Sequence, residues 1–398
     1  MRVLYLCHRI PYPPNKGDKI RAFHQIQAIA AKHELDVFTL ADDPADLVHQ
    51  AELARYCRQL TVTRVHPPVT RLKALPFLFT AKPMTLPYFY SAELAAAVRN
   101  ALQIRNYDRI FAYCSAMAQY VESAADIPLV MDFVDVDSDK WMQYAGVSRF
   151  PFSAVYRREG RCLRQYETRI CERAACAVVS TEREASLLRE ISPAVPIHAI
   201  PNGVDTDYFN PAVVPPQRTL PSIIFTGDMS YFPNQEAVAY FARKVFPLIR
   251  QSIKDARFLI VGRNPNREVQ QLQNIQGVEV TGFVPDVRTY LAKAHVAVAP
   301  FSIAAGIQNK ILEAMAYGLP VVATSRALQG LSPEIAPLVA VADAPAEMAA
   351  AVLVLLRNPQ KEHLGRERVK VEYSWDNSLK RLLLLVEGAK FEIPAVTH

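Results

Sequence analysis

The sequence predicts an α/β protein made of two similar domains, and three features carry that prediction. Short apolar runs with the pattern of buried strands alternate with segments of helical periodicity. A chain of 398 residues is long enough for two or three domains. A turn signal at Asn202-Gly203 separates one such series from the next. We therefore expect a first α/β domain over residues 1–200, a second over 201–372, and a closing helix over 373–398.

Composition and charge exclude several functional classes. The hydrophobic share of 51% and the charged share of 21% are those of an ordinary globular protein. No apolar run reaches the roughly 20 residues of a membrane span, and the N-terminus lacks the layout of a signal peptide, so we expect a cytoplasmic protein. Six cysteines without C-x-x-C spacing and nine scattered histidines predict neither disulfides nor a metal site. The net charge of +6 mildly favours anionic partners, but no nucleic-acid-binding module is found.

The first residues predict a β-α-β unit. A short strand spans Arg2 to Cys7, a helix covers about 19–32, and a second strand covers 36–40. Lys16 and Gly17 stand just before the helix, where a glycine lets the backbone approach a ligand closely. A simple turn is the alternative. The G-x-G-x-x-G spacing of dinucleotide-binding domains does not occur in the sequence, so we expect no cofactor.

Two segments of the first domain have the composition of membrane-contacting elements. Residues 65–90 combine apolar and aromatic side chains with Arg71, Lys73 and Lys82, a mixture that suits the headgroup region of an anionic membrane. Residues 157–173 form a predicted helix that is rich in arginine. The alternatives are a partly buried irregular excursion for the first segment and a solvated helix face for the second.

A predicted buried strand over Val130 to Val134 ends in two acids. Asp135 and Asp137 follow it at the carboxyl end, where open α/β sheets bind their ligands. A carboxylate at this position is suited to hold a hydroxyl-bearing substrate or to accept a proton. Capping of the following helix is the alternative role.

The second domain is expected to begin with a strand over 222–226. Gly227 follows this strand and permits a close backbone approach, and Asn234 is a candidate cap for the next helix. Arg263 follows a predicted strand over 258–261, again at a carboxyl end. A surface arginine without a ligand is the alternative for Arg263.

The most informative stretch is 295–324, which predicts a strand over 296–301 and a helix over roughly 308–317. Lys310 and Glu313 are three residues apart and share one face of that helix. Lys310 lies in the first turn, beside backbone N–H groups without intrahelical partners, and this combination suits a diphosphate. Glu313 is one turn deeper and is suited to accept hydrogen bonds from two adjacent hydroxyls, as on a ribose. A solvent-facing Lys–Glu pair is the alternative.

This stretch resembles the nucleotide-sugar site of the GT-B glycosyltransferases of family 4, the glycosyl transferases group 1. That family carries two glutamates in an E-x7-E pattern followed by residues like GLPVVAT, and Glu313 matches the second glutamate. Ala305 occupies the place of the first glutamate, so the side-chain contact of that residue with the donor sugar is lost. The run GIQNKILEAMA is similar to a branch of the family linked to exopolysaccharide export. The backbone amides that would remain for the donor are those of Gly306, Ile307, Gln308 and Asn309.

The resemblance extends over nearly the whole chain. The run PPNKGDKIR, which contains Lys16 and Gly17, is similar to a glycine motif that faces the donor phosphates and the acceptor. The run AIPNGVDTDYFNP resembles the crossing between the two domains of the family. Phe283 and Val284 match a turn whose backbone reads the nucleobase, and residues 373–388 resemble the helix that crosses back to the first domain.

Two further departures from the family pattern affect the expected site. The family's strand in the first domain ends in His-Asp, whereas here Val134 stands in the place of the histidine and Asp135 matches the aspartate. The loop after Gly227 lacks the arginine and lysine that clamp the diphosphate in many relatives. Lys310, helped by Arg263, would then supply the positive charge.

The resemblance implies the GT-B architecture, with two Rossmann-like domains facing a cleft, the donor on the second domain and the acceptor on the first. The implied reaction transfers a sugar from a nucleotide-sugar to a lipid-linked or saccharide acceptor in exopolysaccharide or other cell-surface glycan synthesis. It proceeds with retention at the anomeric carbon and without a metal. The implied location is the cytoplasm, at the inner face of the membrane. A non-catalytic nucleotide-sugar-binding protein and a GT-B-type nucleotide-sugar epimerase or hydrolase are the alternatives.

Overall fold

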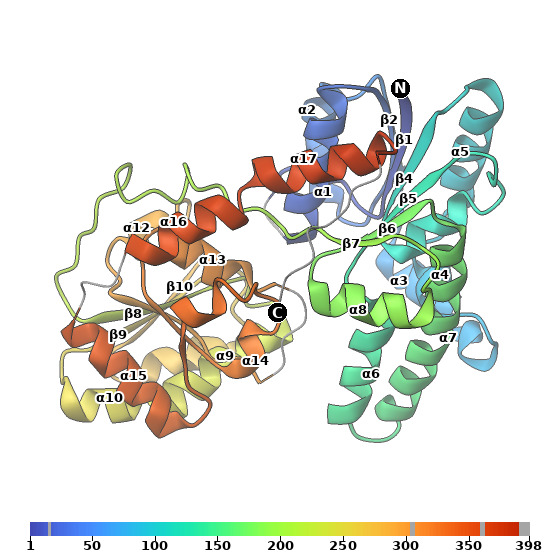
Figure 1. Ribbon diagram of the computed structural model, residues 1–398. Coiled ribbons are helices and arrows are strands. Elements are labelled where there is room, and N and C mark those ends of the chain that lie inside the picture. Colours follow the sequence, from blue (N-terminus) through green and yellow to red (C-terminus); the bar gives the residue numbers. More distant parts are fainter. Residues whose placement is uncertain (15–16, 303–306, 359–362, 390–398) are drawn as a thin grey trace. The chain divides into compact units, whose positions relative to one another are not determined.

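The computed structural model describes residues 1–14, 17–302, 307–358 and 363–389. The chain divides into two compact units. Unit 1 contains Met1–Pro201 together with Ser378–His398, and unit 2 contains Asn202–Asn377. Each unit is built on its own parallel sheet (Figure 1).

The sheet of unit 1 has seven strands within the described residues, and its neighbouring strands are parallel. Their order across the sheet is β3-β2-β1-β4-β5-β6-β7. Because the strands are parallel, their carboxyl ends share one edge, which is where such sheets bind ligands. The strands are β1 (Arg2–Cys7), β2 (Glu34–Ala41), β3 (Gln59–Arg64), β4 (Arg109–Tyr113), β5 (Leu129–Val134), β6 (Cys176–Val179) and β7 (Ile197–Ala199).

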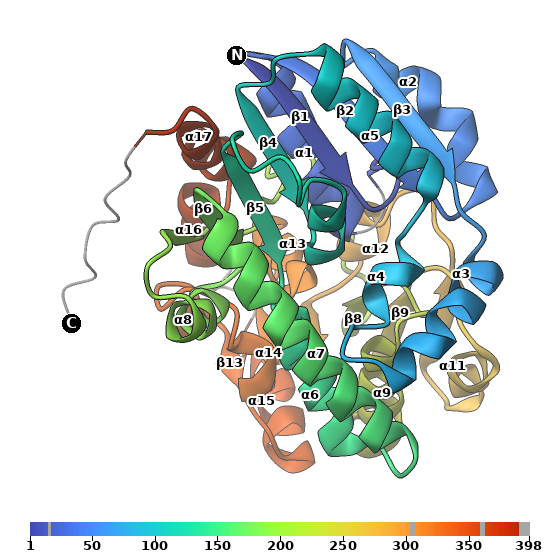
Figure 2. The same cartoon turned by 90° about the vertical axis from the view of Figure 1, so that its right-hand side faces the viewer.

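Helices cover both faces of this sheet (Figure 2). Alternate residues of a strand point to opposite faces. Leu4 of β1 therefore lies in one core with Leu94, whereas Tyr5 lies in the opposite core with Ile26 and Leu382. The helical segments are α1 (Gly17–Ala30), η1 (Pro44–His49), α2 (Gln50–Ala54), α3 (Pro67–Ala74), η2 (Leu75–Phe79), α4 (Thr85–Tyr88), α5 (Ala92–Ile104), η3 (Ser115–Tyr120), α6 (Asp137–Val147), α7 (Phe152–Arg173), α8 (Glu182–Ile191) and α17 (Trp375–Val386), which starts in the last residues of unit 2.

The sheet of unit 2 has six strands within the described residues, in the order β10-β9-β8-β11-β12-β13, and its neighbouring strands are again parallel. Its central strands are buried on both faces, which explains apolar runs such as FLIV and VAVA that show no alternation. The strands are β8 (Ser222–Thr226), β9 (Arg257–Val261), β10 (Val278–Gly282), β11 (Val296–Ala299), β12 (Val321–Ala323) and β13 (Ala340–Val341).

Helical segments connect these strands. They are α9 (Phe232–Tyr240), η4 (Phe241–Val245), α10 (Phe246–Ser252), α11 (Arg267–Gln271), η5 (Leu272–Asn274), α12 (Arg288–Leu291), α13 (Asn309–Ala316), α14 (Ser325–Leu328), η6 (Ala336–Leu338), α15 (Pro345–Arg357) and α16 (His363–Glu372). Two parallel α/β sheets confirm the predicted fold class. Across the described parts of both units, no helix combines the length and the apolar character needed to cross a membrane.

The structure changes several predicted boundaries. Strand β11 ends at Ala299, before the predicted end at residue 301, and α7 begins at Phe152. Residues 65–90 form α3, η2 and α4 instead of an irregular excursion. The prolines allow this because they occupy the first turns of α3 and η2, where the missing backbone N–H would have no intrahelical partner.

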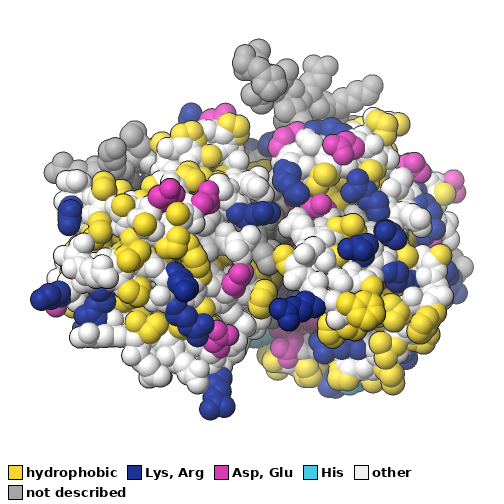
Figure 3. Space-filling view, turned by 90° about the horizontal axis from the view of Figure 1, so that it is seen from below, with side chains coloured by type: hydrophobic (Ala, Val, Ile, Leu, Met, Phe, Trp, Pro, Cys, Tyr) yellow, Lys and Arg dark blue, Asp and Glu magenta, His cyan; other side chains and the backbone are white. Residues whose placement is uncertain are grey.

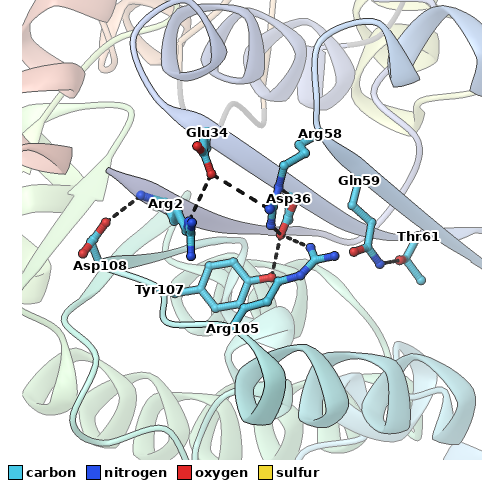
Figure 4. Close-up of polar contacts among 9 residues, drawn as sticks. All are labelled: Arg2, Glu34, Asp36, Arg58, Gln59, Thr61, Arg105, Tyr107 and Asp108. Carbon is cyan, nitrogen blue, oxygen red and sulfur yellow. Dashed lines mark hydrogen bonds and ion pairs between the residues drawn. The ribbon is translucent and has the colours of Figure 1, made fainter.

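Unit 1 also buries charged groups away from its ligand-binding edge. Asp36, near the amino end of β2, is 1% exposed and accepts hydrogen bonds from Arg58, Arg105 and Tyr107 (Figure 4). Burial alone would raise the pKa of Asp36, but these three donors hold it below its usual value. Because it lies at the edge opposite the carboxyl ends of the strands, we interpret this network as structural.

Candidate functional site

The carboxyl ends of β8, β9, β10 and β11 carry most of the predicted donor-site residues. Gly227 follows β8, Arg263 follows shortly after β9, and Phe283 follows β10 directly. Lys310 lies on α13, the helix that follows β11. These four strands are neighbours in the parallel sheet, so the fold brings residues far apart in sequence to one edge.

Lys310 is a partly buried cation at this edge. Its Nζ donates a hydrogen bond of 2.6 Å to Oδ1 of Asn234. The same nitrogen lies 4.4 Å from the ring centre of Phe225 and 4.6 Å from that of Phe301, and aromatic faces attract a cation. Within the described residues, no carboxylate lies at ion-pairing distance from Nζ.

The surroundings of Lys310 disfavour its positive charge. Burial lowers the pKa of Lys310 to about 7, and the attraction of Glu313 offsets only part of that effect. Burial also raises the pKa of Glu313, against the opposing attraction of Lys310. An anion placed beside Nζ would therefore strengthen the charged form of the lysine.

Two glycines bring backbone close to Lys310. A Cβ at Gly227 would lie 2.9 Å from Nδ2 of Asn234 and 3.1 Å from Nζ of Lys310. A Cβ at Gly262 would lie 1.7 Å from the carbonyl oxygen of Gly227, which no side chain can tolerate. Gly262 was not among the predicted site residues, although its place directly after a strand is the signal that singled out Gly227.

Asp228 organises the loop after β8. Its carboxylate accepts hydrogen bonds from Ser230, from Nδ2 of Asn264 at 3.2 Å and from Nε of Arg263 at 2.9 Å. Burial alone would raise the pKa of Asp228, but these donors hold it below its usual value. Arg263, expected to assist Lys310, is thus ion-paired with a carboxylate of the neighbouring loop.

Asn234 does not cap the helix that contains it. The N-cap residue of α9 is Tyr231, and the helix begins two residues before Asn234. Asn234 is instead 5% exposed and donates Nδ2 to the backbone carbonyl of Asp228 at 2.8 Å. Since its Oδ1 accepts from Lys310, the amide links the lysine to the loop after β8.

The start of α13 carries the predicted phosphate-facing amides. Gln308 is the N-cap residue, Asn309 is the first helical residue, and Ile307 precedes them; all three are partly buried. Oδ1 of Asn309 is inaccessible and has no hydrogen-bond partner within the described residues. Glu313 lies one turn after Lys310 on the same helix, as its spacing predicts.

The turn after β10 exposes an aromatic ring. Phe283 is 74% exposed, while Val284 packs in part against the core of unit 2. Next to this turn, Arg288 stacks over the ring of Tyr208 at 3.9 Å and pairs with Asp286. The turn is therefore followed by a fixed Arg288–Tyr208–Asp286 cluster and carries an exposed aromatic ring.

The remaining predicted residues belong to unit 1 or lie outside the described residues. Lys16, Ala305 and Gly306 lie outside the described residues. Gly17 is the first residue of α1, and a Cβ there would meet nothing within 4 Å, so packing inside the described chain does not require a glycine.

Asp135 lies at the carboxyl edge of the sheet of unit 1. It accepts a hydrogen bond of 3.1 Å from Oγ of Ser180. It does not cap α6, whose N-cap residue is Val136, and β5 already ends at Val134. Val134 has a φ of 66°, a conformation that β-branched residues avoid. Such strain is often kept at functional sites.

His8 also lies at this edge of unit 1 and was not predicted as a site residue. Its ring stacks on Tyr113 with a centre-to-centre distance of 5.8 Å, and Nε2 lies 3.5 Å from the carboxylate of Asp18. Burial alone would lower the pKa of His8, but Cys114 and Asp18 raise it to about 9. The sequence does contain a signal for His8, because this residue directly follows strand β1.

Comparisons with known proteins agree with this arrangement. A model of the glycosyl transferases group 1 matches residues 220–358, and a model of the glycosyl transferase 4-like domain matches residues 20–203. The chain is 29% identical over 241 residues to one of the subunits of the phosphatidylinositol N-acetylglucosaminyltransferase of Arabidopsis thaliana, and the match covers 56% of this chain and 51% of that protein. The match thus spans about half the length of this curated relative.

Solved structures share the fold over nearly the whole chain. Sucrose-phosphate synthase from Thermosynechococcus elongatus has a TM-score of 0.72 at 20% identity and covers 98% of each chain. HepE from Anabaena, solved with UDP and glucose, has a TM-score of 0.65 at 14% identity, covering 98% of this chain and 100% of that one. One glycosyltransferase family model matches in each unit, and the two parallel sheets are those of the GT-B fold, so the chain is a glycosyltransferase.

Proposed function

We propose that the protein is a retaining glycosyltransferase that moves a sugar from a nucleotide-sugar to a hydroxyl group of a lipid-linked or saccharide acceptor. One observation carries the proposal. The ammonium of Lys310 is held by Asn234 and two aromatic rings without a carboxylate at ion-pairing distance in the described residues. A cation in this state suits a diphosphate that arrives with the substrate.

The proposed reaction breaks the bond between the anomeric carbon and the diphosphate oxygen and forms a bond from that carbon to the acceptor oxygen. Negative charge develops on the departing diphosphate, and Lys310 stabilises it together with the backbone amides at the start of α13 and beside Gly227. Asn234 positions Lys310 for this role. The acceptor hydroxyl gives its proton to Asp135 of unit 1, the proposed base, and Lys16 and Gly17 are proposed donor contacts that face the phosphates.

The other donor contacts follow the same edge of unit 2. We assign Glu313 to the ribose hydroxyls, the backbone of Phe283 and Val284 to the nucleobase, and Arg263 to a supporting position beside the diphosphate. Of the solved relatives, HepE was crystallised with UDP and glucose and with UDP-glucose. This supports a uridine nucleotide-sugar as the first donor to test.

The proposed acceptor belongs to exopolysaccharide or other cell-surface glycan synthesis, and the proposed location is the cytoplasm, at the inner face of the membrane. The name of the Arabidopsis relative contains phosphatidylinositol, which supports a lipid-linked acceptor. Peripheral contact with the membrane is proposed through residues 65–90 and 157–173.

The test is release of nucleoside diphosphate from candidate nucleotide-sugars, measured with and without a lipid extract as acceptor. The wild-type protein should release UDP from one donor, faster with the extract, and Lys310→Met should lose most of this release. Equal rates for the two proteins would remove Lys310 from the reaction. Binding of the donor without any release would instead favour a non-catalytic nucleotide-sugar-binding protein, the second candidate, which the valine at position 134 supports.

A further inference from the structure

Unit 1 carries exposed apolar side chains on two neighbouring elements. The first element is the α3–η2 segment, and the second is the end of the hairpin formed by α6 and α7 (Figure 2). Phe79 is 89% exposed and Phe150 is 84% exposed, which is unusual for side chains of this size. The apolar members that stand out are Leu72, Leu75, Phe79, Val147, Phe150 and Phe152. We name these six residues, together with the exposed cations Arg71, Lys73, Lys82 and Arg149, the apolar–basic surface.

The apolar side chains of both elements are exposed to solvent. In α3, Thr70 and Ala74 are buried, and Leu72 is exposed on the other side of the helix. Leu75 and Phe79 follow in η2 and are 52% and 89% exposed. On the second element, Val147, Phe150 and Phe152 surround the turn between α6 and α7.

Side-chain contacts hold the two elements together as one piece. The guanidinium of Arg158 in α7 donates to the backbone carbonyls of Phe77, Thr80 and Lys82. Its neighbour Glu159 is 3% exposed and accepts hydrogen bonds from the start of α4. Arg158 lies six residues after Phe152 in the same helix, which corresponds to about 9 Å along its axis. These contacts therefore join the two elements that carry the apolar groups.

The two sequence runs that carry these side chains contain only positive charges. Residues 53–92 contain six Lys and Arg residues and no Asp or Glu. Residues 140–158 contain four Lys and Arg residues and again no Asp or Glu. Arg71, Lys73, Lys82 and Arg149 among them are exposed. Figure 3, which views the molecule from the side on which the hairpin ends, shows hydrophobic side chains gathered beside Lys and Arg side chains. Exposed aromatic and aliphatic groups surrounded by cations suit an anionic bilayer surface, where the rings enter the headgroup boundary and the cations meet lipid phosphates.

We propose that unit 1 docks on anionic membranes through the apolar–basic surface, with the α6–α7 turn and η2 entering the headgroup region. This extends the proposed glycosyl transfer to a lipid-linked acceptor and rests on that function only for its biological purpose. The proposed membrane contact therefore includes residues 65–90 but excludes most of residues 157–173. In α7, Leu163, Tyr166 and Ile170 are buried, and Arg169 and Arg173 contact other parts of unit 1.

The test is sedimentation of the full chain with vesicles of phosphatidylcholine alone or with about one third phosphatidylglycerol. The wild-type protein should bind the anionic vesicles and bind the neutral ones much more weakly. Replacing Leu72, Phe79, Phe150 and Phe152 by serine should lower binding at least about tenfold. Replacing Arg71 and Lys73 by glutamine should lower binding to anionic vesicles by about fivefold per cation.

Matched controls come from other exposed residues. Val48→Ser with Ile104→Ser removes two apolar side chains of unit 1 that are 76% and 71% exposed, and Arg99→Gln with Lys254→Gln removes two exposed cations. Both control proteins should bind vesicles as the wild type does. In addition, the fluorescence of the tryptophan introduced by Phe150→Trp should shift to the blue on anionic vesicles and should be quenched by brominated lipid.

Three results would overturn the proposal. In the first, the wild-type protein stays in solution with anionic vesicles. In the second, the serine variants bind these vesicles as the wild type does. In the third, the wild type self-associates and the serine variants do not, which would make the surface a protein contact. The enzymatic proposal is tested separately. Lys310→Met should bind vesicles normally, and the serine variants should still release nucleoside diphosphate with a water-soluble acceptor.

Discussion

Arg21 in unit 1 and Lys310 in unit 2 are both cations placed inside a parallel α/β unit, but the fold treats their charges differently. Arg21 is 1% exposed, and its guanidinium forms two hydrogen bonds, of 2.8 and 3.2 Å, to the carboxylate of Asp132. It also donates to the carbonyl of Ile200 at 2.8 Å. Lys310 has an amide oxygen and two aromatic faces in place of a carboxylate.

The pKa values of the two cations show the consequence. Burial alone would lower both. For Arg21, the carboxylate of Asp132 more than reverses this effect and the pKa is raised. For Lys310, Glu313 does not reverse it, and the pKa falls to about 7. The comparison teaches that unit 1 neutralises its buried cation within the fold, whereas unit 2 keeps one whose charge a ligand has to stabilise.

The largest effect is expected for the paired cation. Arg21→Met leaves the carboxylate of Asp132 buried without its charged partner and should reduce the free energy of unfolding by about 3–5 kcal/mol. Urea denaturation measures this. The control is Arg21→Met combined with Asp132→Leu, which removes both charges and should recover part of the loss. A single variant as stable as the wild type would show that the pair does not stabilise unit 1.

The unpaired cation should give the opposite result. Lys310→Met should lower the turnover of the nucleotide-sugar by about 10²–10³-fold, the usual effect of removing one charge-stabilising group. Its free energy of unfolding should fall by at most about 1–3 kcal/mol, the cost of leaving Oδ1 of Asn234 without its donor, since the ammonium has no ion pair to lose. Lys293→Met is a matched control, because Lys293 also lies over an aromatic ring but is exposed. Lower stability with normal turnover would assign Lys310 a structural role.

The depressed pKa of Lys310 predicts a pH dependence of nucleotide binding. A diphosphate favours the ammonium form, so binding above about pH 7 requires the uptake of a proton. The affinity for UDP should therefore fall as the pH rises from about 7 to about 9, by up to about tenfold per pH unit. Calorimetry in buffers of different ionisation enthalpy measures the proton uptake, and Lys310→Met should show none. A flat affinity over this range in the wild type would contradict the assignment.

The smallest effect is expected for the neighbouring carboxylate. Glu313→Gln keeps the shape of the side chain but weakens hydrogen bonds from ribose hydroxyls, so the affinity for UDP should fall by about tenfold. Calorimetry with UDP and with free pyrophosphate separates the two contacts, since only UDP contains a ribose. An equal loss for both ligands would show that Glu313 acts through Lys310 and not on the ribose.

Several features of the site could be predicted because their signals are local in sequence. The spacing of Lys310 and Glu313 determines that they share a helix face, and α13 forms where that spacing requires it. Gly227 is a candidate because it directly follows a buried strand, and the structure places its backbone close to Lys310. The prediction that Asn234 caps a helix is wrong, because Tyr231 is the N-cap residue and the amide of Asn234 bridges Asp228 and Lys310.

The sequence by itself determined the alternation of strands and helices, the two α/β units, and which side chains follow the carboxyl ends of their strands. Only the tertiary structure decided that Phe225, Phe301 and Asn234 surround Lys310, that Gly262 has to pass the carbonyl of Gly227, and that η2 lies against the start of α7. The reason is physical. Periodicity and capping depend on residues a few positions apart, whereas these contacts join segments that become neighbours only when the sheet orders its strands.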